Sequence, residues 1–254
     1  MTDNQTIDIF EGMTSISAVI KSIKDGVSDR KIEKILYDPT RSASKHRELS
    51  FLRHASDELH FELLPSDESS INTLSSGTTH GGIIAVCSKR SFSSLNVNYL
   101  TNKSFLAILE GIEDPYNFGY SVRSLYAAGA DGIILPPRNW MEFSGTVARS
   151  AAGTSELADI TISDSVDAVR LCKEHGFQIV CAGIRDSVPH DEHDFSKPTL
   201  LVIGGEKRGI SRKILDLADA TVRIDYGREF MGSLPSASAI SVIAFEIARQ
   251  RKRK

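Results

Sequence analysis

Cysteine is scarce in this chain of 254 residues, and its three copies, Cys87, Cys172 and Cys181, lie far apart. Without a Cys-x-x-Cys pair, the sequence indicates neither a disulfide framework nor a cysteine-bound zinc site. No apolar run approaches the roughly 20 residues that a membrane-spanning helix needs. The first residues are polar and acidic, unlike a signal peptide. We therefore expect a cytoplasmic protein that makes no use of a membrane or of disulfide bonds.

A strong charge of either sign is also lacking, since the formal net charge is −3. This balance is not typical of a general nucleic-acid binder, and a composition of 41% hydrophobic and 25% charged residues is ordinary for a globular protein. Basic residues nevertheless gather locally. Each cluster alone is consistent with a solvated face, whereas together they could form a basic stripe. The clusters are Arg41/Lys45/Arg47/Arg53, Lys89-Arg90, Lys207-Arg208/Arg212-Lys213 and Arg249 to Lys254.

Metal ligands and a nucleophile with a histidine base are not apparent in the sequence. His190-x-x-His193 has a ligand-like spacing but no partner cluster, so we predict no metal site. None of the seven histidines lies near a plausible nucleophile in sequence, which argues against Ser-His-Asp chemistry.

Hydrophobic periodicity predicts two domains. Residues 7–90 alternate between amphipathic helices and short strands, which indicates a small α/β unit within a first domain at residues 1–91. The Ser/Asn-rich stretch 92–102 is predicted as a linker. From residue 103 to residue 254, apolar strands alternate with helical segments, and this pattern is typical of a parallel sheet with helices on both faces. The basic end of the last helix could be helical or a disordered tail.

Residues 200–239 contain two apolar strands, and each ends in a loop with glycines that leads into a helix. In open α/β sheets, ligands bind beside such strand ends. Gly204-Gly205-Glu206-Lys207-Arg208-Gly209 has neither the P-loop spacing nor the dinucleotide-binding spacing. An ordinary strand-to-helix turn remains an alternative interpretation of this loop.

Polar candidates for chemistry are dense between positions 110 and 123, where they are Glu110, Glu113, Asp114, Asn117 and Arg123, and two more follow in later loops. Asn117 stands at the start of a predicted helix, where capping is the simpler explanation. Arg123 lies six residues further on, where a surface charge is the alternative. Glu206 follows two glycines at a strand end and could cap the next helix or hold a substrate group, and Ser233 lies in the later loop.

Three segments, taken together and in this order, resemble motifs of the SpoU/TrmH group of the SPOUT superfamily. This group consists of RNA ribose 2′-O-methyltransferases that use S-adenosylmethionine. The first segment is Glu110 to Arg123, with Asp114-Pro115-x-Asn117-x-Gly119 at its centre. The second is Ile203 to Gly209, and the third is Ile224 followed by Gly232-Ser233-Leu234. Glu11-Gly12 and His80-Gly81-Gly82-Ile83 more loosely resemble landmarks of the ribosomal-protein-like α/β domain that binds RNA in many members.

The resemblance implies a C-terminal trefoil knot, a homodimer with the active site at the subunit junction, and structured RNA as substrate, rRNA rather than tRNA. Asn117, Arg123, Glu206 and Ser233 would be the catalytic residues, with Arg123 binding a phosphate and stabilising the developing alkoxide. The cofactor pocket would be lined by Gly183, Gly204, Ile224 and Leu234.

One position departs from the family pattern, because Pro235 replaces the asparagine that usually follows Ser-Leu in the third motif. Proline offers neither an amide side chain nor a backbone N–H. This change keeps open the alternative of a non-catalytic RNA-binding protein with the same fold. The sequence is also compatible with a tRNA ribose methyltransferase and, less well, with a metabolite enzyme that has a Rossmann-like sheet.

Overall fold

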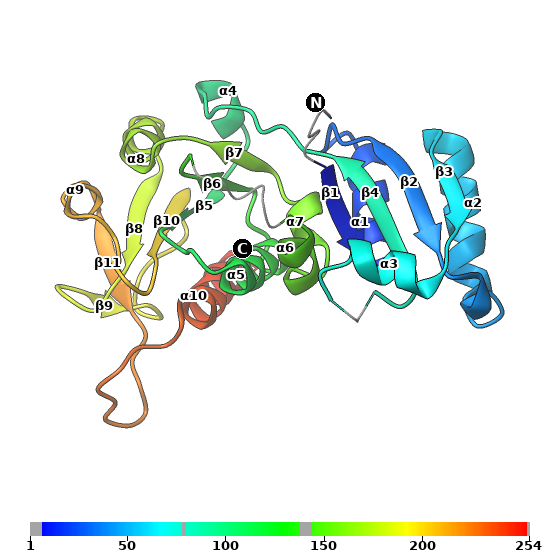
Figure 1. Ribbon diagram of the computed structural model, residues 1–254. Coiled ribbons are helices and arrows are strands. Elements are labelled where there is room, and N and C mark those ends of the chain that lie inside the picture. The colour runs from blue at the N-terminus through cyan, green and yellow to red at the C-terminus, as the bar shows by residue number, and fades with distance from the viewer. Residues whose placement is uncertain (1–6, 78–79, 138–143, 253–254) are drawn as a thin grey trace, which may run out of the picture. The chain divides into compact units, whose positions relative to one another are not determined.

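The computed structural model describes residues 7–77, 80–137 and 144–252, which fold into two compact units (Figure 1). The first unit contains residues 1–91 together with 139–157, and the second contains residues 92–138 and 158–254. The chain therefore passes from one unit to the other three times, after residues 91, 138 and 157. The predicted boundary at residue 91 coincides with the first of these passages, but the return of 139–157 to the first unit differs from the prediction.

The first unit is built on a mixed four-stranded sheet in the order β1-β4-β2-β3. Strand β4 is antiparallel to both of its neighbours, and β2 is parallel to β3. Alternate strand residues point to opposite faces of the sheet. Ile35 and Ile83 pack with helices α1 and α2, whereas Leu36 and Ile84 pack with Ile71 of α3. The elements up to residue 88 are β1 (Ile7–Glu11), α1 (Gly12–Lys24), β2 (Ile32–Tyr37), the 3-10 turn η1 (Pro39–Arg41), α2 (His46–Leu59), β3 (Glu62–Pro65), α3 (Glu68–Leu74) and β4 (Ile83–Ser88).

Two further helices complete the first unit, α6 (Ser144–Ser150) and α7 (Thr154–Leu157). Ala148 of α6 is fully buried in the same core as α1 and α2. The backbones of α6 and β1 are in direct contact, because a Cβ atom at Gly145 would lie only 2.2 Å from the carbonyl oxygen of Ile9. Only glycine permits so close an approach.

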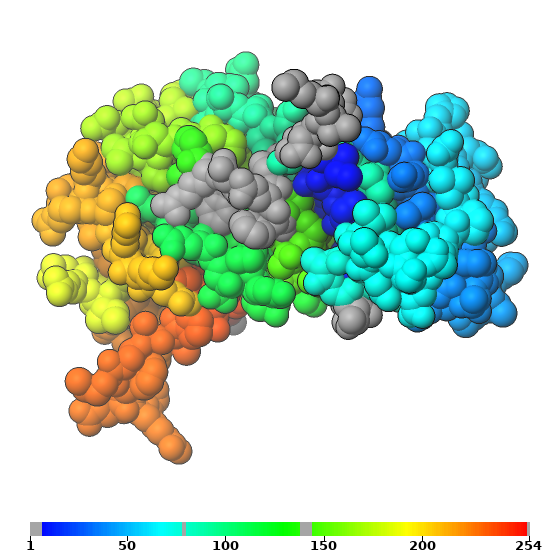
Figure 2. Space-filling view, in the orientation of Figure 1, coloured from blue at the N-terminus to red at the C-terminus, as the bar shows by residue number. Residues whose placement is uncertain are grey.

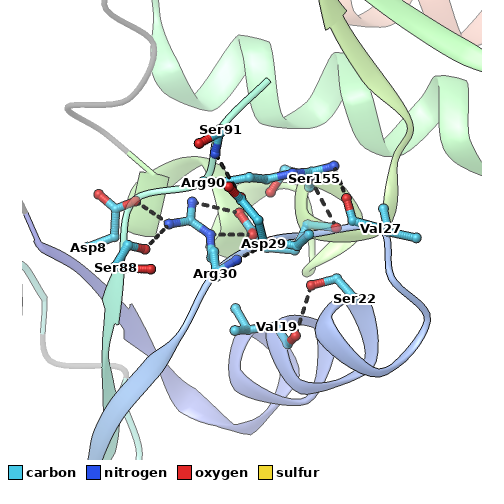
Figure 3. Close-up of polar contacts among 12 residues, drawn as sticks. Asp8, Val19, Ser22, Val27, Asp29, Arg30, Ser88, Arg90, Ser91 and Ser155 are labelled. Carbon is cyan, nitrogen blue, oxygen red and sulfur yellow. Dashed lines mark hydrogen bonds and ion pairs between the residues drawn. The ribbon is translucent and has the colours of Figure 1, made fainter. Parts of the chain in front are cut away.

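A buried network of charged side chains joins α7 to the rest of the first unit (Figure 3). The Arg30 guanidinium donates to Asp8 Oδ2 at 2.5 Å and to Glu156 Oε2 at 2.8 Å, and all three side chains are nearly inaccessible to solvent. Arg90 donates to the carbonyl oxygens of Ser155 and Glu156. Burial disfavours the charge of Arg30, but Glu156 and Asp8 outweigh burial and raise its pKa. Removal of one partner would leave a buried charge uncompensated, which is strongly destabilising.

The second unit is a seven-stranded sheet in the order β7-β6-β5-β10-β8-β11-β9, and every neighbouring pair is parallel. Its strands are β5 (Phe105–Glu110), β6 (Gly132–Leu135), β7 (Ile160–Ile162), β8 (Gln178–Ala182), β9 (Val188–Pro189), β10 (Thr199–Gly204) and β11 (Ala220–Arg223). Its helices are α4 (Val97–Leu100), α5 (Pro115–Ala127), α8 (Ser165–Glu174), α9 (Arg212–Leu215) and α10 (Ser236–Arg251).

Helices cover both faces of this sheet, which confirms the predicted parallel sheet with helices on both sides. Residues of α4, α8 and α9 share one apolar core with alternate strand residues, and α5 and α10 pack against each other on the other side (Figure 1). The hydroxyl oxygens of Ser124 in α5 and Ser241 in α10 are 2.7 Å apart. The helix predicted from Ser211 onward consists of a single turn, α9. Among the described residues, no helix combines the length and apolar character that crossing a bilayer requires.

The stretch 92–102, predicted as a linker, belongs to the second unit. The backbone N–H of Leu95 donates to Ile162, and the N–H of Ile162 donates to Ser93, so this stretch runs along the edge of β7. Leu100 is buried in the core beneath α8. The Ser/Asn-rich composition of residues 92–102 did not indicate that they pair with β7, because these hydrogen bonds use backbone groups that any residue supplies.

The basic C-terminal segment is helical as far as Arg251. The Arg251 guanidinium donates to the carbonyl oxygens of Ser104 and Lys197, and Arg249 pairs with Glu246. Part of the basic charge therefore holds α10 in place. Figure 2 shows the second unit's surface in the same orientation, with the loop before α10 standing out from it.

Candidate functional site

The polar loops of the second unit gather at one edge of its sheet. Because all strands are parallel, the loops that follow β5, β10, β8 and β11 leave from the same carboxyl edge, and these four strands are neighbours in the order just given. Ligands of open α/β sheets bind at this edge. The three segments singled out in the sequence follow β5, β10 and β11 and therefore converge here.

A cavity of about 610 Å³ lies among the loops that follow β8, β10 and β11. Six of the eight predicted site residues line it: Gly183, Gly204, Glu206, Ile224, Ser233 and Leu234. Its apolar wall includes Ile203, Val222 and Ile243. Its charged residues are Arg185, Glu206, Arg223 and Asp225. The cavity falls within the range of 300–1,000 Å³ that is usual for sites of drug-sized ligands.

The loop after β10 fits tightly against the loop after β5. The N–H of Gly205 donates to the carbonyl oxygen of Glu110 at 2.6 Å, and a Cβ atom at Gly205 would lie only 1.9 Å from the carbonyl oxygen of Gly111. Glycine is therefore required at position 205 so that the first two motif segments can touch. The alternative of an ordinary turn does not explain this requirement.

A second, smaller cavity of about 110 Å³ lies beside the first, at the N-terminal end of α5. Two residues, Glu206 and Ser236, line both cavities. The Asn117 side-chain N–H donates to Glu206 Oε1 at 3.3 Å. The remaining lining residues are Gly111, Ile112, Glu113, Asp114, Asn117 and Lys207, of which Lys207 and Glu113 form an ion pair at 2.9 Å.

Asn117 does not cap the helix, contrary to the simpler interpretation of its position. Helix α5 begins two residues earlier, at Pro115, and its N-cap is Asp114, whose carboxylate accepts from the Asn117 backbone N–H at 2.8 Å. The Asn117 side chain is thereby available for Glu206. The Asp-Pro pair is itself a recognisable helix start, because proline is well suited to the first helical position.

Arg123 is the predicted residue that the second unit does not bring to the cavities. It lies two turns further along α5, its side chain is exposed, and it lines neither of the two cavities. Tyr116 and Tyr120 precede it at positions i−7 and i−3, so the three side chains share one exposed face of the helix.

Pro235 occupies the N-cap position of α10, without a side-chain hydrogen bond to the helix. It is not among the residues that line the larger cavity, so it does not close the cavity. The next residue, Ser236, donates its hydroxyl to the carbonyl oxygen of Gly204 at 3.1 Å. The start of α10 is therefore attached to the end of β10 through Ser236.

Several contacts at the site were not evident from the sequence. The Tyr226 hydroxyl accepts from the backbone N–H of Leu234 at 3.1 Å, and the Tyr226 ring packs edge-on against Phe230. Arg223 pairs with Asp225 at 2.6 Å. The partner of Tyr226 is a backbone N–H, and the partner of Arg223 is a residue two positions away. Neither kind of contact has a recognisable sequence motif. Within the described part of the chain, no three His, Cys, Asp or Glu residues are grouped as metal ligands would be.

Comparisons with known proteins agree with this geometry. A family model described as the SpoU rRNA Methylase family matches residues 104–245, more than half of the chain. The 23S rRNA (guanosine-2′-O-)-methyltransferase RlmB of Ralstonia nicotianae is 28% identical over 229 residues, which cover 87% of this chain and 89% of that protein. A protein of Staphylococcus saprophyticus, whose name places it among TrmH family tRNA/rRNA methyltransferases, is 28% identical over 231 residues, with coverage of 89% and 91%.

A solved structure shares the fold. The AdoMet-bound rRNA methyltransferase from Sinorhizobium meliloti superposes with a TM-score of 0.77 at 22% identity, and the match covers 97% of this chain and 88% of that one. The region of the family match, residues 104–245, includes both cavities and all three motif segments. The chain therefore belongs to the SpoU rRNA Methylase family, within the SpoU/TrmH group of S-adenosylmethionine-dependent RNA methyltransferases.

Proposed function

We propose that this protein transfers a methyl group from S-adenosylmethionine to a ribose 2′-hydroxyl of structured RNA, with rRNA as the substrate. The observation that carries the proposal is the position of Glu206, whose carboxylate lies at the boundary between the two adjoining cavities. A methyltransferase needs its donor and its acceptor side by side, with the reacting atoms aligned. The name of the Ralstonia relative, a guanosine-2′-O-methyltransferase of 23S rRNA, supports both the hydroxyl and the RNA class.

The larger cavity suits the cofactor. Its volume of about 610 Å³ is sufficient for a ligand of this size, and its walls combine backbone groups of Gly183 and Gly204 with apolar side chains such as Ile224 and Leu234. Glu206 supplies a carboxylate that a cationic ligand can meet, whereas Asp225 is already paired with Arg223. When bound, the cofactor supplies the electrophilic methyl group on its sulfonium.

The smaller cavity would receive the acceptor ribose. Glu206 would accept a hydrogen bond from the 2′-hydroxyl and orient its oxygen towards the larger cavity. Asn117 holds the Glu206 carboxylate, and Lys207 at the same cavity could meet the adjacent phosphate. Ser233 would donate a hydrogen bond from the side of the larger cavity. A positioned set of this kind lowers the barrier mainly through orientation.

Arg123 would reach the site through a homodimer. Exposed apolar side chains accompany it on α5 and continue on the neighbouring helix α10, where Phe245 is 52% exposed. These side chains are Tyr116, Tyr120, Val242 and Phe245. Exposed apolar patches of this kind often mark protein interfaces. In a dimer formed through this face, Arg123 of one subunit would meet the cavities of the other and stabilise the negative charge that develops on the ribose oxygen.

Two experiments test the dimer. Phe245→Glu should yield a monomer in sedimentation velocity, with cofactor binding retained and methyl transfer lost. Val97→Glu, at an exposed position on α4, is the matched control and should leave the oligomeric state and methyl transfer unchanged. A mixture of Arg123→Ala and Glu206→Gln subunits should regain activity, because one of the two sites in each mixed dimer would be intact. Continued inactivity of mixed dimers would place Arg123 and Glu206 in the same subunit's site.

The first unit would bind the RNA substrate. The outward side of α2 carries Arg47 and Arg53, and both side chains are exposed. Lys45 precedes this helix and extends the basic surface, whereas Arg41 is paired with Asp38 and Glu68. Phosphate contacts of this kind supply much of the affinity for RNA without reading its sequence. Because the net charge of the chain is negative, a local basic surface that binds RNA fits the composition better than general binding to nucleic acids.

We also propose that the C-terminal segment forms a trefoil knot. Strand β11 lies beyond β8 in the sheet, yet α10, which follows it, returns to pack beside β10 and α5. The returning segment reaches the β10 loop, where Ser236 bonds to Gly204. An experimental structure traced through residues 200–240 tests whether this segment passes through the loop or over it.

The central experiment incubates the protein with methyl-labelled S-adenosylmethionine and either unmodified rRNA or tRNA, followed by digestion and mass spectrometry. The expected product is a 2′-O-methylated nucleotide from the rRNA. Labelled tRNA instead would favour the tRNA alternative, which is consistent with the name of the Staphylococcus relative. A label on a base would overturn the ribose assignment.

A non-catalytic RNA-binding protein remains the second candidate, because Pro235 replaces a motif asparagine. Calorimetry separates the two candidates, since a protein that only binds RNA has no need of the cofactor. Binding of S-adenosylmethionine without transfer to any RNA, together with RNA binding, would support this second candidate.

A further inference from the structure

The larger cavity has two walls that are joined by one arginine side chain. One wall is formed by residues 183–185 of the loop 183–187 after β8, and the other is the segment 222–226 at the end of β11 and just beyond it. In the sheet, Val222 of β11 pairs with Ala182 on one side and with Val188 on the other. The loop 183–187 must therefore cross over β11 to connect these two positions. Arg223, the last residue of β11, lies where the loop crosses.

The Arg223 side chain makes one contact with each wall. Its Nη1 donates to the carbonyl oxygen of Ser187 at 2.5 Å, and its Nε donates to Asp225 Oδ1 at 2.6 Å. Arg223 and Asp225 both line the cavity. The side chain is only a third exposed, so these contacts are partly shielded from solvent. A planar guanidinium can hold two acceptors in a fixed arrangement, which a lysine ammonium on a flexible stem does poorly.

Further hydrogen bonds connect the two residues that flank Arg223, Ser187 and Asp225, to the rest of each wall. The Ser187 hydroxyl donates to the carbonyl oxygen of Ile184 at 2.7 Å, so a contact at Ser187 is transmitted across the loop. On the other wall, Tyr226 follows Asp225 and accepts from the N–H of Leu234. The position of Arg223 therefore influences the positions of Ile184 and Leu234, which both line the cavity.

We infer that Arg223 is a positioning residue for the methyl donor: its side chain sets the separation of the two walls that would enclose S-adenosylmethionine. This inference rests on the proposed assignment of the larger cavity to the cofactor. Arg223 acts through the loop and through Asp225, which it keeps against the wall as an ordered carboxylate. Its loss should weaken cofactor binding, whereas the alignment of acceptor and donor at Glu206 should persist once the cofactor is bound.

The test measures S-adenosylmethionine binding by calorimetry and methyl transfer to RNA by steady-state kinetics, both on the full-length protein. Arg223→Ala should raise Kd and the KM for the cofactor roughly tenfold, the size expected for the loss of one strong polar contact. The value of kcat at saturating cofactor should stay within about twofold, since no group at Glu206 is removed. Arg223→Lys should behave like Arg223→Ala, because the charge is kept but the double contact is not.

Arg212→Ala is the matched control. Arg212 forms an ion pair with Asp216 at 2.8 Å on α9, its side chain is exposed, and it does not line the cavity. This variant should leave Kd, KM and kcat unchanged. Asp225→Asn provides a second variant in case Arg223→Ala does not fold. Asp225→Asn should also raise Kd, and the double variant should be no weaker than the worse single one, because the two side chains act as one unit.

The outcomes separate the inference from the proposed function. If the wild type binds S-adenosylmethionine and Arg223→Ala binds it equally well, the inference is overturned and the proposed function stands. Full recovery by Arg223→Lys would show that charge alone matters, which also overturns it. A fall in kcat with unchanged KM would assign Arg223 to the transfer step instead. If the wild type does not bind the cofactor, the assignment of the cavity fails, and the inference fails with it.

Discussion

At the scale of single residues, the site is organised around the contact between Glu206 and Asn117. Glu206 comes from the loop after β10 and Asn117 from the helix that follows β5, and they meet because the two strands are neighbours in register, with Gly204 opposite Glu110. The carboxylate is exposed to both cavities, and the amide that holds it comes from the first turn of α5. Fixing a reactive carboxylate with a neutral donor orients the group without cancelling its charge.

Arg123→Ala should abolish methyl transfer and leave the Kd for S-adenosylmethionine near the wild-type value. The reason is geometric: Arg123 is exposed and does not line the larger cavity, so its role would be limited to the RNA and the developing oxyanion. Calorimetry and single-turnover transfer on the same preparation measure the two effects. Arg170→Ala, on the exposed side of α8, is the control and should change neither. A parallel loss of cofactor affinity in Arg123→Ala would contradict the assigned role.

Pro235→Asn should stabilise the protein and leave transfer at least as fast. Asparagine is among the preferred N-cap residues, and the present N-cap makes no side-chain hydrogen bond to α10. The gain should be about 0.5–1 kcal/mol, visible as a higher midpoint in thermal denaturation. Slower transfer with unchanged stability would indicate that the rigid proline holds the Ser233–Leu234 segment in its working position.

At the scale of elements, the two glycine-bearing loops depend on contact between backbones. Gly205→Ala should therefore be damaging, because its Cβ would fall 1.9 Å from the carbonyl oxygen of Gly111 and push the β10 and β5 loops apart. We expect a loss of about 1–3 kcal/mol in the free energy of unfolding, together with much weaker cofactor binding. Denaturant titration and calorimetry measure these two quantities.

Gly227→Ala is the control for this prediction. Position 227 lies in the exposed loop before α10, with no atom near the site of the added methyl group and no positive φ. Stability and cofactor binding should stay at wild-type values. Equal tolerance of both substitutions would show that the β10 and β5 loops do not need the close approach of Gly205.

Elements could be predicted from the sequence where the pattern that specifies them lies within the element itself. The parallel sheet with helices on both faces was predicted correctly, because apolar periodicity and helix-ending glycines are local features. The placement of residues 92–102 was missed, since Leu95 and Ser93 bind β7 through their backbones. The return of α6 and α7 to the first unit was missed as well. One of the contacts involved pairs Arg30 with Glu156, residues far apart in sequence, and neither shows by its type that it is buried.

The candidate site followed the same rule. Glu206 and the glycines of its loop were singled out through their resemblance to a family motif with fixed spacing, and their roles stay predictions. Arg223 and Tyr226 were not found, because their partners Ser187 and Leu234 contribute only a carbonyl oxygen and an N–H. Contacts of a side chain with backbone leave no pattern in a single sequence, so they emerge only when the register of β8, β9 and β11 is known.

At the scale of the whole molecule, the three cysteines can report separately on the two units. Burial raises the pKa of Cys87, Cys172 and Cys181 to about 12. Cys87 lies in the first unit, and Cys172 and Cys181 lie in the second. Because only the thiolate reacts, iodoacetamide at pH 8 should label these residues only after local or global opening. Mass spectrometry across a urea series then gives the opening of each unit. Rapid labelling without urea would contradict the burial.

The same thiols predict how stability depends on pH. Their pKa in the folded protein lies above the ordinary value of 9.0, so their contribution to stability is complete below pH 9. Between pH 9 and about 12 the unfolded chain ionises while the folded chain does not, and the free energy of unfolding should fall. Urea midpoints measured over this range test the sign, and replacement of the cysteines by alanine or serine should flatten the slope.

The three passages of the chain between the two units have a consequence for biosynthesis. A ribosome releases β1 through β4 well before α7, and β5, α5 and β6 emerge in between. Until Glu156 leaves the exit tunnel, the nascent Arg30 has only half of its eventual counterions. The first unit therefore cannot complete its folding before the first strands of the second unit have been translated. We expect the two units to complete folding together instead of one after the other.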